Sequence, residues 1–329
     1  MNNTHNRGGF GIVLVLALIG VCRLAPAGPI DDYGIDFATI GAPENVGYSF
    51  PPIPPLDGRG AVDYEYRLAR TEITVGQWFE FVQAYAPYFN PNQDFISSFI
   101  GLYIDLEPGG SLNDPDTYVL YPENANLPTP MSWRMAARYC NWLHNGKATD
   151  QEAFESGAYD TSTFTSNPDG TYNDQLTHSP DAKYWIPTFD EWIKGMHYDP
   201  ALNDGAGGWW QYPNSSNSAP LAGLPGVGET NASLGSQGIL GPHLDVGSYP
   251  DQQSPWGLLD GSGGMREWTE ETFGSNRGDR FIKGSSFLSD DFNYQTEDSI
   301  NRLDGANTTI TRYEGLRIAS VIPGPSGVW

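Results

Sequence analysis

Few side chains in this sequence combine the type and spacing that catalysis requires. The histidines beyond the N-terminal segment are His144, His178, His197 and His243, and no two of them have a metal-ligand spacing. No phosphate-binding loop, nucleophile elbow or dinucleotide fingerprint is present. Cys140 lies in an apolar stripe, where a free thiol usually packs as a small hydrophobe. We therefore assign no catalytic residue.

One pair of carboxylates has a spacing suited to binding a cation. Asp260 and Glu267 are seven residues apart and enclose a loop that reads GSGGMR. Glycines let a backbone turn several carbonyl groups toward one point, and Ca²⁺ prefers such oxygen ligands. The alternative is a plain turn in which Asp260 is solvated and Glu267 forms a buried ion pair. Both interpretations stay open from the sequence.

The composition indicates a folded, loop-rich and acidic chain. Its 329 residues include 39 Gly and 26 Pro, which favour irregular connections, while ten Trp and 18 Tyr supply the buried area that disordered chains lack. The formal net charge is −23 and the pI is near 4.3. Because nucleic acids repel such a surface, they are excluded as partners.

The first 27 residues have the order of a signal peptide. Arg7 precedes an apolar run over residues 12–21, which is shorter than the ~20 residues that span a bilayer, and Ala-Pro-Ala follows at 25–27. We expect an exported protein, located in the periplasm, outside the cell or at its surface. After signal removal no membrane span is expected, and Cys140 would be the one cysteine left, which excludes an internal disulfide.

The elements that must position these residues can be placed by pattern. Residues 28–61 are predicted to form an extended lead-in rich in Pro and Gly, and residues 64–69 alternate as a strand does. Helices are predicted to begin at Thr74, Ser132 and Thr188, because each of these caps precedes an apolar stripe of helical period. Residues 323–329 are predicted to form a short tail.

Four segments carry patterns that match one family in order. They read RTEITVGQW at 70–78, PMSW to ARYCNWL at 130–143, YWIPTFDEW at 184–192, and VGSYP, GLLD, EWT, KGSSF and GLRIA between 246 and 319. This series resembles the formylglycine-generating-enzyme/sulfatase-modifying-factor family. The resemblance implies one domain over residues 62–322, with an α+β, C-type-lectin-like fold that has little regular secondary structure and long loops.

The resemblance also implies that the two copper-binding cysteines of the family are missing. Relatives that oxidise cysteine to formylglycine hold copper with two cysteines just after the KGSSF block. Counted from Lys283, those positions fall on Ser289 and Tyr294, and neither supplies the soft thiolate that Cu(I) prefers. We therefore do not expect copper as a cofactor or copper-dependent formylglycine formation.

Three functions remain open. The leading one is an exported, non-copper member that binds a ligand, glycan or protein partner in the cleft of the family, near Ser289, Asp290, Asp291 and Tyr294. The second is an oxidoreductase or other protein-modifying enzyme with a non-standard active site. The third is a structural surface protein.

Calcium is the cofactor that the resemblance suggests. Carried over from relatives, the ligands would be the side chains of Asp260 and Glu267 and the backbone oxygens of Gly263 and Met265. A second calcium site near Asn231 would match the family by position.

Overall fold

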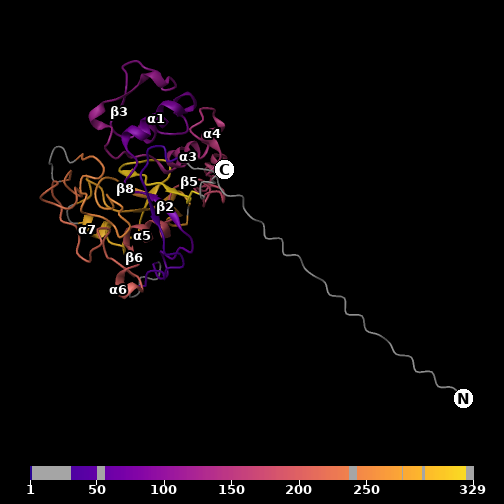
Figure 1. Cartoon of the computed structure of the whole chain (residues 1–329). Coiled ribbons are helices and arrows are strands. Elements are labelled where there is room, and N and C mark those ends of the chain that lie inside the picture. The colour runs from indigo at the N-terminus through magenta and orange to yellow at the C-terminus, as the bar shows by residue number, and fades with distance from the viewer. Residues whose placement is uncertain (2–30, 50–55, 237–242, 276, 291–292, 324–329) are drawn as a thin grey trace, which may run out of the picture. The chain divides into compact units, whose positions relative to one another are not determined.

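A computed structural model describes residue 1 and residues 31–49, 56–236, 243–275, 277–290 and 293–323. The predicted signal peptide beyond Met1, Asp291, and the tail beyond residue 323 lie outside these ranges. Residues 30–322 form one compact unit (Figure 1). Within the described ranges, no helix has the length and apolar character that a bilayer crossing needs.

The regular elements are short and widely spaced. The strands are β1 (Phe37–Ile40), β2 (Tyr66–Ala69), β3 (Ile104–Leu106), β4 (Tyr118–Leu120), β5 (Tyr184–Trp185), β6 (Tyr198–Asp199), β7 (Gly208–Trp209), β8 (Arg266–Thr272), β9 (Asp279–Lys283), β10 (Asp304–Asn307), β11 (Glu314–Gly315) and β12 (Ala319–Ser320). The helices are α1 (Val75–Tyr85), α2 (Ile96–Ile100), α3 (Trp133–His144), α4 (Glu152–Glu155), α5 (Phe189–His197), α6 (Leu202–Gly205) and α7 (Tyr294–Glu297). Four single-turn 3₁₀ helices add η1 (Ala86–Tyr88), η2 (Pro115–Thr117), η3 (Pro122–Asn124) and η4 (Thr161–Thr163). The predicted mixture of helices, strands and long loops is confirmed.

The first sheet joins distant parts of the chain. Its order is β1-β2-β12-β5 and every neighbouring pair is antiparallel. The predicted strand at 64–69 is therefore present as β2. The lead-in also contributes a strand, because β1 pairs with β2 along its whole length. Short strands that pair only with remote partners carry little sequence signal, and β1 was not predicted.

The second sheet positions the Asp260–Glu267 segment. Its order is β10-β9-β8-β11, with β8 and β9 antiparallel and β11 parallel to β8. Strand β8 begins at Arg266, directly after the glycine-rich loop. Glu267 is thus held by a strand with a neighbour on each side, while Asp260 stays in the loop before it.

The three main helices begin where the sequence predicts. At α1, the Thr74 hydroxyl accepts the backbone N–H of Gln77 and the Gln77 side chain accepts the N–H of Thr74. Thr188 and Glu191 make the same reciprocal pair at α5. Ser132 caps α3 by accepting the N–H of Met135. These caps are local contacts, which is why the sequence reveals them.

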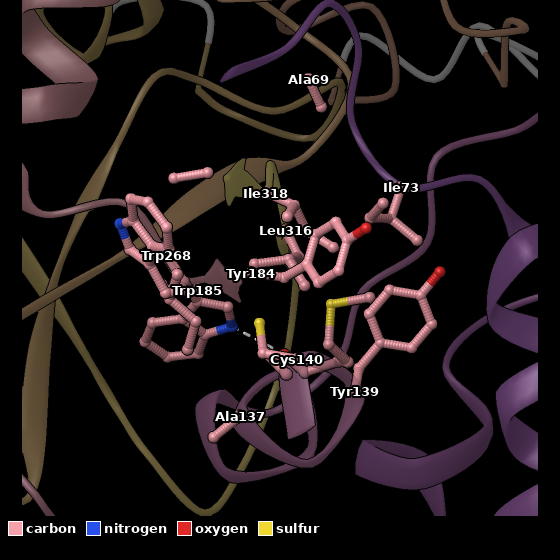
Figure 2. Close-up of a cluster of buried hydrophobic side chains, with 14 of the residues drawn as sticks. Ala69, Ile73, Ala137, Tyr139, Cys140, Tyr184, Trp185, Trp268, Leu316 and Ile318 are labelled. Carbon is pink, nitrogen blue, oxygen red and sulfur yellow. Dashed lines mark hydrogen bonds between the residues drawn. The ribbon is translucent and has the colours of Figure 1, made fainter. Parts of the chain in front are cut away.

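The core joins both sheets, because α3 packs against β5 of the first sheet and α5 packs against β8 of the second. Figure 2 shows Cys140 of α3 among Tyr184, Trp185 and Trp268, with Leu316 and Ile318 from the chain's end. All of these side chains are buried. In this core, Trp268 Nε1 donates to the backbone carbonyl of Met131 at 2.7 Å. This satisfies the polar edge of a ring that is otherwise surrounded by apolar atoms.

Candidate functional site

The glycine-rich loop fits closely around two polar side chains. Gly263 and Gly264 have positive φ angles of 85° and 59°, a region that side chains rarely adopt. A Cβ atom at Gly263 would lie 2.2 Å from Asn231 Oδ1, and one at Gly264 would lie 2.2 Å from Glu72 Oε2. The glycines are therefore required both by the backbone conformation and by the approach of Asn231 and Glu72.

Glu267 forms a buried ion pair. Arg317 donates to both of its carboxylate oxygens, from Nε at 2.9 Å and from Nη2 at 2.7 Å, and Trp192 Nε1 donates at 2.6 Å. The side chains of Arg317 and Glu267 are 0% and 1% exposed. Arg317 also donates to the carbonyls of Ala69 and Leu259. Protein donors thus occupy the Glu267 carboxylate, as the ion-pair alternative describes.

Asp260 faces a different environment at the other end of the loop. It lies beside a cavity of about 10 Å³ that is also lined by Glu72, Asn231, Asp245 and Ser262. This volume is about that of one water molecule or one ion. One Asp260 oxygen accepts the N–H of Gly247 at 2.7 Å. The loop therefore separates the predicted ligands, with Asp260 at a small polar cavity and Glu267 beside Arg317.

Glu72 is a buried carboxylate that completes this cavity. Its Oε1 accepts the N–H of Met265 at 2.8 Å, whereas Oε2 is buried without a hydrogen-bond partner among the residues that the structure describes. Burial, followed by the negative charges of Glu267 and Asp260, raises the pKa of Glu72 well above its usual range. Burial likewise raises the pKa of Asp260 to about 6. The charge of Arg317 opposes both of these pKa increases, although its hydrogen bonds to carboxylates in the described structure go to Glu267.

The predicted calcium ligands differ in how well they suit a cation in this cavity. The free oxygen of Glu72 and the carboxylate of Asp260 suit a hard cation, because both are oxygen donors beside an ion-sized space. Glu267 does not fit as well, since Arg317 and Trp192 already use its oxygens. In the described part of the chain, no group of three or more His, Cys, Asp or Glu side chains has a metal-site arrangement.

Sequence reasoning missed Glu72 and Arg317. Both belong to the patterned segments at 70–78 and 315–319, but they lie 193 and 50 residues from their partners Met265 and Glu267. Spacing along the chain gives no sign of such contacts. The available signal was a charged residue at a position inside a block whose other members are mostly apolar or small.

The segment from Ser289 to Tyr294, here called the Ser289 segment, holds its two hydroxyls inside the protein. Ser289 is 8% exposed; its hydroxyl donates to Glu297 and accepts the N–H of Ser286. Tyr294 is 6% exposed and donates to the carbonyl of Pro220 at 3.2 Å. Asp290 is exposed, and Asp291 lies outside the described residues. Of the predicted cleft residues in the described ranges, only Asp290 therefore faces solvent.

Cys140 is a structural residue. It is free, fully buried and surrounded by the apolar side chains in Figure 2. Burial raises the pKa of its thiol well above the usual value, so the reactive thiolate is disfavoured. The sequence-based interpretation of Cys140 as a small hydrophobe is confirmed.

Comparison with known proteins identifies one matching family model and several similar solved structures. A family model described as "Sulfatase-modifying factor enzyme 1-like domain" matches residues 60–322. No curated protein sequence matches the chain. Similar solved structures include CarF, with 19% identity, a TM-score of 0.52, and coverage of 88% of this chain and 99% of that one. They also include variable protein 1 of Treponema denticola (15% identity, TM-score 0.47, 87% and 95%) and PvdO from Pseudomonas aeruginosa (14%, 0.45, 91% and 100%).

Proposed function

Because the chain belongs to the sulfatase-modifying factor enzyme 1-like family and has its C-type-lectin-like fold, we propose that it is an exported, non-copper member that binds a ligand. What supports this proposal is the resemblance itself, by which Ser289 and Tyr294, counted from Lys283, fall where copper-binding relatives have cysteines. Without its metal ligands, the site of the family could still bind a ligand, although it would not carry out copper chemistry.

The geometry around Ser289 supports the loss of copper. Its hydroxyl is engaged by Glu297 and Ser286, and the Tyr294 hydroxyl by Pro220, so each is already used within the protein. Cu(I) is a soft ion that prefers thiolates over hydroxyl oxygens. Cys140 cannot substitute, because its thiol is enclosed in the core.

The ligand is proposed to be a small molecule, a glycan or a protein segment that docks on the Ser289 segment. Asp290 supplies an exposed carboxylate there. Its backbone carbonyl accepts the N–H groups of Asn293 and Tyr294, which fix the turn that presents it. Export rests on the signal-like order of residues 1–27.

We also propose that Ca²⁺ stabilises the glycine-rich loop. The residues that would hold the ion are Asp260 and Glu72, with backbone oxygens of the loop completing the set. Its charge would offset the surplus of carboxylates around Arg317. The support is the Glu72 oxygen that has no partner among the described residues and lies beside a cavity of about 10 Å³.

The copper proposal is tested by Cu(I) titration against a competing chelator. The wild-type protein is expected to bind no stoichiometric Cu(I) and to form no aldehyde on a cysteine-containing sulfatase peptide supplied with oxygen. The matched control is the double variant Ser289→Cys/Tyr294→Cys, which should gain Cu(I) affinity. Wild-type turnover that Ser289→Ala abolishes would overturn the proposal.

A further inference from the structure

A second, much larger cavity lies away from the Ser289 segment. It has a volume of about 610 Å³ and opens to solvent between α3, α4, η4 and the turn before α2. Small-molecule sites usually fall between about 300 and 1,000 Å³. In Figure 1, α3 and α4 lie together while α7, next to Ser289, lies on another side of the compact unit. The two sites share no lining residue.

A buried guanidinium nitrogen lies near a carboxylate in the wall of this cavity, with no hydrogen bond between them. Arg138 Nη1 lies 3.8 Å from Asp94 Oδ2, too far for a hydrogen bond. Among the described residues, Nη1 has no hydrogen-bond partner. The two side chains are only 9% and 6% exposed. Buried polar groups of this kind are normally paired, so the gap indicates that something else completes them.

Neighbouring side chains fix the position of the Arg138 guanidinium. Its Nε donates to Glu155 at 3.3 Å, and its guanidinium lies over the rings of Tyr85 and Phe164. One turn earlier on α3, Arg134 makes two hydrogen bonds to Asp174, at 3.0 and 2.6 Å. Such fixed groups lose little freedom when a ligand binds, which favours affinity.

The charges of the cavity select among ligand classes. An anion would satisfy Arg138 but would meet Asp94, Glu155, Glu152 and Asp160, which also line the cavity. A cation would be attracted by these carboxylates, which outnumber the two guanidinium groups, but it cannot accept a hydrogen bond from Arg138 Nη1. A hydroxyl group avoids both conflicts, because it can accept from Arg138 Nη1 and donate to Asp94.

We propose that this cavity binds a neutral polyhydroxylated ligand, of the size of a mono- or disaccharide, with one hydroxyl bridging Arg138 and Asp94. The amides of Gln93 and Gln151 and the hydroxyl of Ser162 line the same cavity and provide partners for further hydroxyls. The inference goes beyond the proposed function and does not depend on it, since the Ser289 segment takes no part.

The test uses the mature protein and a panel of neutral saccharides, with glucuronate and glucosamine as charged counterparts, followed by ligand-observed NMR and calorimetry. At least one neutral saccharide should bind, and more tightly than either charged counterpart. Ser162→Trp, an exposed change at the rim, should abolish binding by filling the cavity. Arg138→Met should weaken it about tenfold or more, because a hydrogen bond to a charged group is lost.

Two control variants separate this site from the Ser289 segment. Ser218→Trp adds the same bulk at an exposed position outside the cavity, and Asp290→Arg alters the Ser289 segment. Both should bind the saccharide as the wild-type protein does. The inference is overturned if no neutral saccharide binds, if Ser162→Trp leaves binding intact, or if Asp290→Arg removes it; the last result would instead support ligand docking at the Ser289 segment.

Discussion

The carboxylates around the glycine-rich loop are unevenly neutralised. Arg317 gives two hydrogen bonds to Glu267 and none to Glu72 or Asp260 in the described structure. Removing one partner from a buried ion pair leaves an uncompensated charge, which typically costs about 3–5 kcal/mol. Glu267 therefore stabilises the fold through Arg317, whereas Glu72 and Asp260 are the carboxylates proposed to hold a cation.

Calcium should raise the melting temperature through Asp260 and Glu72. An ion that binds only the folded state adds about 2.7 kcal/mol at a hundredfold excess over its Kd, which corresponds to a few degrees for a chain of this size. Calorimetry of chelator-treated and calcium-loaded protein measures this increment. Asp260→Ala should erase it and Glu72→Gln should reduce it.

Two variants serve as controls for the calcium experiment. Asp290→Ala lies outside the loop and should keep the full increment. Glu267→Gln should lower the melting temperature with or without calcium, because it weakens the contact with Arg317, yet keep the difference between the two states. Equal melting temperatures for stripped and loaded wild-type protein would mean that the loop is a plain turn.

Asp298 should give stability a dependence on pH. It is 1% exposed, accepts hydrogen bonds from Ser285 and Ser262, and burial raises its pKa to about 7. Because the pKa is higher in the folded than in the unfolded state, the protonated carboxyl stabilises the fold. This stabilisation is complete below about pH 4, the pKa of an unfolded aspartate, and is lost as the pH rises through 7. The loss is about 1.4 kcal/mol for each unit by which the two pKa values differ. Urea unfolding of wild type and Asp298→Asn across this range measures the effect. The variant should lose less stability as the pH rises; parallel curves would exclude Asp298 as the source.

At the scale of elements, the two capping boxes differ in what they anchor. At α1, the Gln77 side chain accepts the N–H of Thr74 and reaches one further partner, the carbonyl of Gly34. At α5, the buried Glu191 carboxylate accepts the N–H of Thr188 and also hydrogen bonds from Trp185 Nε1 and the Tyr64 hydroxyl. The second box therefore ties a helix start to two other segments.

Substitutions at α5 should reflect this difference. Thr188→Ala and the matched Thr74→Ala at α1 should each cost about 1 kcal/mol, the usual loss for a cap. Glu191→Ala should cost more, because it leaves the buried Trp185 Nε1 without an acceptor, a loss of about 1–3 kcal/mol, and also removes the contacts with Thr188 and Tyr64. Denaturant unfolding gives these values. A loss for Glu191→Ala no larger than that for Thr188→Ala would show that the extra contacts contribute nothing.

The difference between local contacts and contacts with remote segments explains how far the sequence predicts the structure. Helix starts at Thr74, Ser132 and Thr188 depend on residues three positions away, and all three were predicted. Strands such as β5 and β12 have two residues each and exist only through remote pairing. The pairs Glu267–Arg317 and Arg138–Asp94 likewise join separate segments, so spacing identified Glu267 without its partner and missed the large cavity altogether.

At the scale of the whole molecule, the mature protein should contain a single, shielded thiol. If processing occurs near Gly28, only Cys140 remains, and it is buried in the core. Exported protein should therefore show an N-terminus near Gly28 and one thiol that reacts with a labelling reagent only after denaturation. Rapid labelling of the native protein, or an intact leader on exported material, would contradict this expectation.

The place of β12 in the first sheet has a consequence for how the chain folds. Residues 319 and 320 pair with residues 67–68 on one side and with residues 184–185 on the other, so the sheet closes only when the end of the domain arrives. Contacts between such distant segments slow folding, because the entropy of loop closure is lost before the stabilising contacts form. Nascent chains that end before residue 319 cannot complete this sheet. The domain should therefore complete its fold only after residue 320 has been synthesised, a delay that would suit the export proposed above.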